Sequence, residues 1–223
     1  FSQLRFKIEG AGSLLNALTA TYKVVNTEGS TKNKIFGVEY AQYAKAEVDF
    51  IKHFPIAKQS SLAFRSFLGI AIPYGNSDNI PFSQSYFAGG TTDNRGFKAY
   101  RLGPGSSGSI LDYNEANMKI TLNLEYRFPI LGALKGALFT DVGNIWNVAD
   151  NTRFDEYKFK DLSSLKDVGL STGFGLRYDF NFFVIRLDMG IPTYDPAQEM
   201  SNRWIKKFRI KETVFNFGIN YPF

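Results

Sequence analysis

Several residue types that would support particular chemistries are absent or scarce in this 223-residue sequence. It has no cysteine, which excludes a disulfide framework and a cysteine-ligated zinc site. Its single histidine, His53, leaves little room for a histidine-based metal site or a catalytic triad, and we expect no special role for it. We therefore predict no metal and no cofactor. No uncharged apolar run reaches the roughly 18 residues of a transmembrane helix, so such a helix is excluded.

The first residues lack the basic stretch and apolar stretch of a signal peptide, so we expect a mature chain or a fragment. The formal net charge is +5 and the isoelectric point is about 9.2. Lysine and arginine are nevertheless scattered over the whole chain and form no basic aromatic module. The sequence therefore predicts no nucleic-acid partner.

Aromatic residues and glycine are abundant: the chain has 22 Phe, 12 Tyr and 20 Gly. The mean hydropathy is nevertheless only −0.19, which indicates that apolar residues are interspersed with polar ones. The clearest alternation covers 113–128, where odd positions are mostly polar up to Arg127 and even positions are mostly apolar up to Phe128. A period of two is typical of strands. We predict eight strands, over 2–9, 34–52, 60–72, 113–128, 133–143, 166–180, 182–191 and 215–223.

Most of these segments exceed the five or six residues usual in soluble sheets and suit membrane-spanning strands of about nine to eleven residues. Their polar faces favour an aqueous interior over a soluble sandwich or a lipocalin-like barrel. Short connections (53–59, 129–132, 179–181) alternate with long ones (10–33, 73–112, 144–165, 192–210), as in bacterial outer-membrane barrels. The predicted fold is an all-β, antiparallel transmembrane β-barrel. We expect Trp146 and Trp204 to serve in an interfacial belt or in loop packing.

The longest loop, 73–112, has a distinctive centre that reads YFAGGTTDNRGF over 86–97, followed by RLGPG over 101–105. Loops of this length within a compact barrel are usually functional or disordered. Composition alone favours a flexible external loop. The residues singled out as a motif are Gly89, Gly90, Arg95, Gly96 and Phe97.

Phe-x-Gly-Gly, Arg-Gly-Phe and Leu-Gly-Pro resemble loop six of the BamA/TamA superfamily of outer-membrane assembly and translocation barrels, the bacterial surface antigen family. The resemblance implies that the loop tip folds into the lumen and that Arg95 pairs with acidic residues on the next two strands. Alternation already places Glu125 on a polar face. Asp141 lies in FTDVGNIW, which is similar to the family's Phe-x-Asp-x-Gly-Asn-x-Trp. A guanidinium can bind a carboxylate through two hydrogen bonds, which lysine cannot do equivalently.

The end of the chain looks like the C-terminal recognition signal of outer-membrane barrels. That signal is a polar residue, a glycine, an aromatic residue and a final phenylalanine, here Asn216, Gly218, Tyr221 and Phe223. Pro222 departs from the usual strand residue because it removes a backbone donor, which an edge or a weak seam would tolerate.

The superfamily barrel has sixteen strands and follows soluble periplasmic POTRA modules. The eight predicted strands resemble its C-terminal half, so residues 1–223 are expected to be one such half with no POTRA module. An eight-stranded barrel could not easily hold this loop as well as its own side chains. A half-barrel that closes by oligomerisation, or artificially when alone, fits better. The predicted inward glycines, Gly169, Gly173, Gly175 and Gly190, would leave room for an inserted loop.

The resemblance implies insertion, assembly or translocation of proteins at the bacterial outer membrane, without a chemical step. The implied partners are outer-membrane lipids, nascent outer-membrane proteins as clients, and a POTRA region or accessory lipoproteins. The alternative is a self-contained eight-stranded adhesin or anchor, which predicts an exposed loop and no lumen partner for Arg95. An outer-membrane enzyme would need a histidine-assisted nucleophile or paired acids near the outer rim. His53 lies at the short-turn end, and we do not interpret Asp93 and Asp141 as catalytic.

Overall fold

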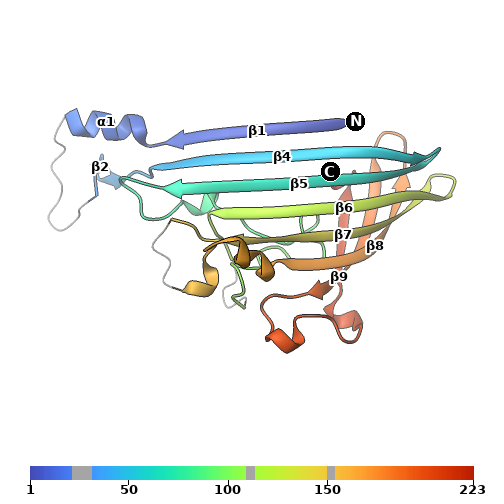
Figure 1. Ribbon diagram of the computed structural model, residues 1–223. Helices are drawn as coiled ribbons and strands as arrows, with labels where there is room; N and C mark the ends of the chain where they lie inside the picture. The colour runs from blue at the N-terminus through green and yellow to red at the C-terminus, as the bar shows by residue number, and fades with distance from the viewer. Residues whose placement is uncertain (22–31, 109–113, 150–153) are drawn as a thin grey trace.

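The computed structural model describes residues 1–21, 32–108, 114–149 and 154–223 (Figure 1). It contains one eight-stranded antiparallel sheet in which every strand pairs with its sequence neighbours within the sheet. The strands, in spatial order, are β1 (Ser2–Ala11), β4 (Tyr43–Ala57), β5 (Ser60–Pro73), β6 (Met118–Leu131), β7 (Leu134–Trp146), β8 (Gly169–Asp179), β9 (Val184–Tyr194) and β10 (Val214–Ile219).

The remaining elements lie in the long connections at one end of the sheet. They are helix α1 (Ser13–Thr21), the small hairpin β2 (Lys34–Ile35) and β3 (Val38–Glu39), and five 3₁₀ turns: η1 (Phe82–Gln84), η2 (Asp155–Tyr157), η3 (Leu162–Asp167), η4 (Met200–Asn202) and η5 (Ile210–Glu212). Within the described ranges, no helix has the length and apolar character needed to cross a membrane.

The two faces of the sheet invert the usual arrangement of a soluble protein. On β6, Thr121, Asn123 and Glu125 are buried, whereas Leu122 and Leu124 are about two-fifths exposed. The same division holds on β8 to β10, where the exposed residues are Phe174, Leu176, Tyr178, Leu187, Phe215 and Phe217. An apolar outer face and a polar inner face are typical of strands that cross a lipid bilayer around a polar interior.

The sheet curves but does not close. Figure 1 shows β8 to β10 turning away from the plane of β1 to β6. In the described part of the chain, β1 pairs only with β4 and β10 pairs only with β9. The eight strands therefore form a curved open sheet, and the artificial closure considered from the sequence does not occur in the described chain.

Several predicted strand boundaries are wrong, and three of them differ most from the structure. The strand predicted over 34–52 begins only at Tyr43. Phe36 and Gly37 adopt positive φ, so residues 34–39 form the separate β2–β3 hairpin instead. The strand predicted over 113–128 begins at Met118, and position 113 lies outside the described residues. The predicted turn 53–59 is mostly strand, since β4 continues to Ala57 through a bulge near Pro55. The predicted turn 129–132 is likewise mostly strand, since β6 continues to Leu131.

The last strand is also shorter than predicted. Alternation had placed Tyr221 and Phe223 on the outer face of a strand over 215–223, but β10 ends at Ile219. Asn220 has a φ of 66°, which redirects the chain, and Pro222 has no N–H with which to continue the ladder. Other predicted loop positions, 22–31, 109–112 and 150–153, lie outside the described residues.

The face assignment predicts that Leu124→Arg in the full-length protein costs about 2–4 kcal/mol of folding free energy, because Leu124 is on the outer face near the middle of β6. Urea titration of the protein folded into lipid vesicles would measure this loss. Leu165→Arg is the matched control, since Leu165 is similarly exposed but lies in η3 outside the strands. Equal effects of the two substitutions would contradict the assignment.

Candidate functional site

The loop between β5 and β6 turns back onto the inner face of the sheet. Tyr86 and Ala116 exchange backbone hydrogen bonds of 2.8 and 2.9 Å, which close the base of the loop. Nearer the tip, the Gly90 N–H donates to the Phe97 carbonyl at 2.8 Å. Gly89 and Gly90 have φ values of 91° and 105°, a backbone region that favours glycine. The motif therefore builds a tight turn over 90–97.

Asp93 fixes this turn from both sides. Its carboxylate accepts the Gly89 N–H at 2.7 Å within the loop and the Thr121 hydroxyl at 2.9 Å from β6. Lys119, also on β6, forms an ion pair with it at 3.1 Å. The tip reaches β8 as well, because the Asn94 side chain donates to the Gly169 carbonyl at 2.9 Å. These contacts hold the loop to β6 and β8 independently of Arg95.

Arg95 lies at the centre of the inner face and is fully buried. Its Nε and Nη2 donate to the two carboxylate oxygens of Asp141 at 2.8 and 2.9 Å, and its backbone N–H adds a third bond at 3.0 Å. Its Nη1 donates to Glu125 Oε2 at 2.5 Å. The guanidinium carbon lies 3.5 Å from the centre of the Phe139 ring. The structure thus brings the motif arginine together with both acidic residues singled out in the sequence.

The network extends to residues that the sequence analysis did not single out. Arg177 on β8 contacts Glu125 at 3.1 Å and Asp188 on β9 at 2.5 Å. Arg186 binds Asp188 at 2.6 Å, and Arg127 binds Glu125 at 2.8 Å. Alternation within each strand also places these side chains on the polar face. Their partners, however, depend on how the strands are aligned with one another, which alternation does not specify.

Each carboxylate of the network is paired several times. Glu125 contacts three arginines. Asp188 contacts Arg177 and Arg186 closely, and Arg95 lies 3.6 Å from it. Asp141 also accepts a hydrogen bond from the Asn123 amide at 2.9 Å. Buried charges are costly unless they are paired and hydrogen-bonded in this way. Since arginines occupy these carboxylates, the arrangement suits a structural brace better than general acid–base chemistry.

Glycines on β8 and β9 make the space that the loop fills. A Cβ on Gly190 would overlap the Arg95 carbonyl and come within 2.7 Å of the Gly96 nitrogen. A Cβ on Gly169 would lie 2.7 Å from Leu102 and 3.2 Å from the Phe97 ring. The other two predicted inward glycines, Gly173 and Gly175, make room for Phe139 and for the Arg177–Asp188 pair.

The C-terminal motif lies against the same network. Asn216 on β10 is buried, and its amide donates to the Arg95 carbonyl at 2.9 Å. A Cβ on Gly218 would come within 2.6 Å of the Arg186 guanidinium. Arg127 lies 4.2 Å from the centre of the Tyr221 ring, and its Nη2 donates to the main-chain oxygen of Phe223 at 3.1 Å. The resemblance suggested a recognition signal, and these internal contacts were not foreseen.

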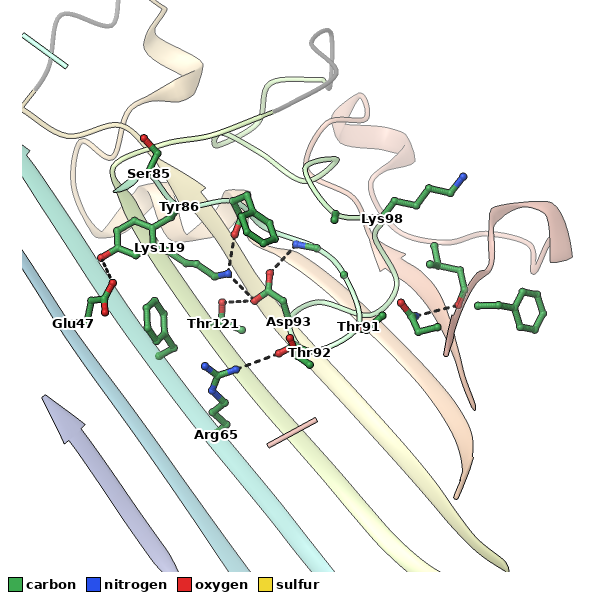
Figure 2. Close-up of a pocket in the computed structure, with 18 of the residues that line it drawn as sticks. Glu47, Arg65, Ser85, Tyr86, Thr91, Thr92, Asp93, Lys98, Lys119 and Thr121 are labelled. Atoms are coloured by element: carbon green, nitrogen blue, oxygen red, sulfur yellow. Dashed lines mark hydrogen bonds and ion pairs between the residues drawn. The ribbon is translucent and has the colours of Figure 1, made fainter. Parts of the chain in front are cut away.

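A cavity of about 720 Å³ lies beside the loop tip, between β4–β6 and the start of β10 (Figure 2). Its charged lining is mostly paired: Arg65 binds Asp49 at 2.9 Å, and Lys119 binds Asp93. Burial and the nearby Glu47 raise the pKa of the Tyr86 phenol, which donates to Glu47 at 3.0 Å. The cavity continues the inner face, and both charged side chains and aromatic rings line it.

The two tryptophans differ in environment. Trp146 is fully buried at the end of β7 and packs edge-on against Phe159 at 5.5 Å, so it serves in loop packing. Trp204 is 60% exposed, and the centre of its ring lies 5.0 Å from the centre of the Tyr194 ring. His53 lies within β4, and its ring is 5.8 Å from that of Phe1.

The close approach at Gly190 predicts that Gly190→Val destabilises the full-length protein by about 1–3 kcal/mol, because the side chain would push the loop tip away from β9. Gly10→Val is the matched control: Gly10 is also in a strand, and a Cβ added there would meet no atom within 4 Å in the described chain beyond its own neighbours. Chemical unfolding in lipid vesicles would compare them. A loss no larger than that of Gly10→Val would contradict this packing of the loop tip against β9.

Comparison with known proteins agrees with this geometry. The sequence profile of the Omp85 superfamily domain matches residues 23–223. The outer membrane protein assembly factor BamA of Neisseria meningitidis serogroup B is 32% identical over 114 residues, which are 48% of this chain and 14% of that protein. The crystal structure of BamA from Haemophilus ducreyi lacking POTRA domains 1–3 has a TM-score of 0.56 at 19% identity, covering 79% of this chain and 34% of that one.

The chain thus spans well under two thirds of either relative. The structural likeness confirms the predicted fold, an antiparallel sheet of the outer-membrane barrel type, and the family and its relatives agree with the predicted location in the bacterial outer membrane. Because the profile covers nearly the whole sequence, the chain belongs to the Omp85 superfamily.

Proposed function

We propose that residues 1–223 form the C-terminal half of a sixteen-stranded barrel that inserts, assembles or translocates proteins at the bacterial outer membrane. The proposal assigns none of these residues to a POTRA module. It is supported by the family match over 23–223 and by the similarity to an outer membrane protein assembly factor. The open sheet also supports it, because the unpaired edges of β1 and β10 require further strands in lipid.

The observation that carries the proposal is the burial of Arg95 among carboxylates from three strands, β6, β7 and β9. Arg95–Gly96–Phe97 then acts as an internal brace. The Arg95 guanidinium ties β6 to β7, and the Arg95 backbone carbonyl accepts a hydrogen bond from Asn216 on β10. The adhesin or anchor alternative requires an exposed, unpaired Arg95, and no contact of this residue favours it.

The work proposed for this unit is mechanical. A rigid inner face keeps the strands in register while the edge strands meet client chains, which would be nascent outer-membrane proteins. Lipids of the outer membrane surround the apolar outer face, and a POTRA region or accessory lipoproteins would deliver the clients. No covalent step is needed, because the arginine-paired carboxylates serve as fixed charges.

The test is Arg95→Lys in the full-length protein, expressed in cells whose own copy can be depleted. Lysine keeps the charge but loses the forked geometry that binds Asp141 through two nitrogens. We expect the amount of folded porin in the outer membrane to fall severalfold, because a buried charge-assisted bond contributes about 1.5–3 kcal/mol and its loss weakens the brace. Heat-modifiability on gels reports folded porin. Arg209→Lys is the control, because Arg209 is largely exposed.

The level and protease resistance of the variant itself must be measured in parallel, so that lost function is separated from lost folding. Normal porin assembly with Arg95→Lys, at a normal level of the protein, would contradict the bracing role. Normal porin assembly after depletion of the whole protein would contradict the assembly function itself.

A further inference from the structure

The connection between β9 and β10 carries an exposed segment that the inner network does not use. All residues of 204–212 are exposed, and they include Trp204 at 60%, Phe208 at 58% and Ile210 at 67%. Five basic residues and one acidic residue fall within 203–212: Arg203, Lys206, Lys207, Arg209, Lys211 and Glu212. Large apolar side chains and cations are therefore interspersed along one exposed segment, which we call the basic aromatic segment, 203–212.

The base of this segment is fixed to the end of β9. Asp195 and Arg203 are joined by a backbone bond of 2.8 Å, and Ile205 donates to Thr193 at 2.9 Å. Arg203 also forms an ion pair with Asp167 at 2.8 Å. The segment is therefore held at the rim of the sheet, beyond the ends of β9 and β10 in Figure 1.

Its position is continuous with the outer face. Immediately after it, β10 presents Phe215 and Phe217 on that face, at 59% and 64% exposure. The segment belongs to the end with the long connections, which in outer-membrane barrels is the external end. Aromatic side chains next to the end of a spanning strand are suited to the boundary between acyl chains and headgroups.

The charges of the segment point to the chemistry of the ligand. Arg209 is paired with Glu212 at 3.2 Å, whereas Lys206 donates to the neutral Asn202 side chain at 2.9 Å. Four of the basic residues and two acidic ones line a groove of about 670 Å³, which therefore keeps an excess of positive charge: Arg203, Lys206, Lys207 and Arg209 with Asp195 and Glu212. Lysine and arginine beside exposed aromatic residues match a lipid with a phosphorylated headgroup, whose phosphate would meet the cations while its chains meet the aromatic rings.

We propose that the basic aromatic segment, 203–212, binds anionic phosphorylated lipid headgroups of the outer leaflet and anchors the β9–β10 rim to them. This rests on the placement in the outer membrane and not on the assembly function. Headgroup binding here would fix how deeply β10, the strand at the open edge of the sheet, lies in the membrane.

The test uses the full-length protein in nanodiscs of phosphatidylcholine with increasing fractions of phosphorylated lipid A. Ser201→Cys, in a background without other cysteines, carries a polarity-sensitive dye next to the groove. Ser201 is exposed, and this chain contributes no native cysteine. We expect the dye emission to shift with lipid A and the shift to weaken at high salt, because exposed charges are screened.

Lys206→Glu with Lys207→Glu should raise the lipid A fraction at half-shift by at least about tenfold, given the attraction of each basic residue to an anionic surface. Lys158→Glu with Lys160→Glu is the matched control: it changes the net charge equally at the same end of the sheet but in another loop. The control should leave the half-shift unchanged.

Three results would overturn the proposal. One is an equal response of both double variants. Another is the same dye shift from inorganic phosphate in pure phosphatidylcholine discs, which would indicate a site for free anions. The third is a dye that is already shielded in neutral discs and unresponsive to lipid A, which would indicate that protein covers the segment.

Discussion

The structure depends on the solvation of one buried cation. Removing a guanidinium from water costs several kcal/mol even after the protein relaxes, and that cost is offset only when its N–H groups have partners of good geometry. Arg95 meets this condition with two nitrogens and its backbone N–H on Asp141, one nitrogen on Glu125, and the Phe139 ring beneath it. No single strand could supply these groups, so satisfying Arg95 fixes β6 and β7 relative to the loop.

The same requirement explains the composition of β8 to β10. Four buried arginines have three carboxylates between them, so some carboxylates must serve more than one cation. Arg177 and Arg186 share Asp188, and Arg127 and Arg177 share Glu125. The strands that face the loop must leave room for it, and a side chain at position 190 would collide with the Arg95 carbonyl, so this position is glycine. Polar residues fill the interior while apolar residues face outward, an arrangement typical of barrels that span a lipid bilayer.

The sequence predicted the faces of the strands well but not the contacts across them. A period of two assigns Glu125 to the inner face whatever its neighbours are, whereas the proximity of Asn123 to Asp141 requires the register of β6 on β7. The loop motif supplied the missing long-range information for Arg95, Glu125 and Asp141. Nothing comparable pointed to Asp188 or to the bond between Asn216 and Arg95. Backbone conformation at Phe36 and Asn220 likewise overrode a pattern that favoured strand.

The contrast between the centre and the edges of the sheet bears on how such a unit could work. β4 to β7 are 13 to 15 residues long, whereas β10 has only six and, among the described residues, pairs only with β9. Few ladder bonds join β10 to β9, and the bond from Asn216 to the Arg95 carbonyl and the packing of Gly218 against Arg186 hold it further. The loop tip therefore stabilises the weakest strand from inside. A displacement of Arg95 would loosen β10 before it disturbed β4 to β7, because those strands are held by long ladders of their own.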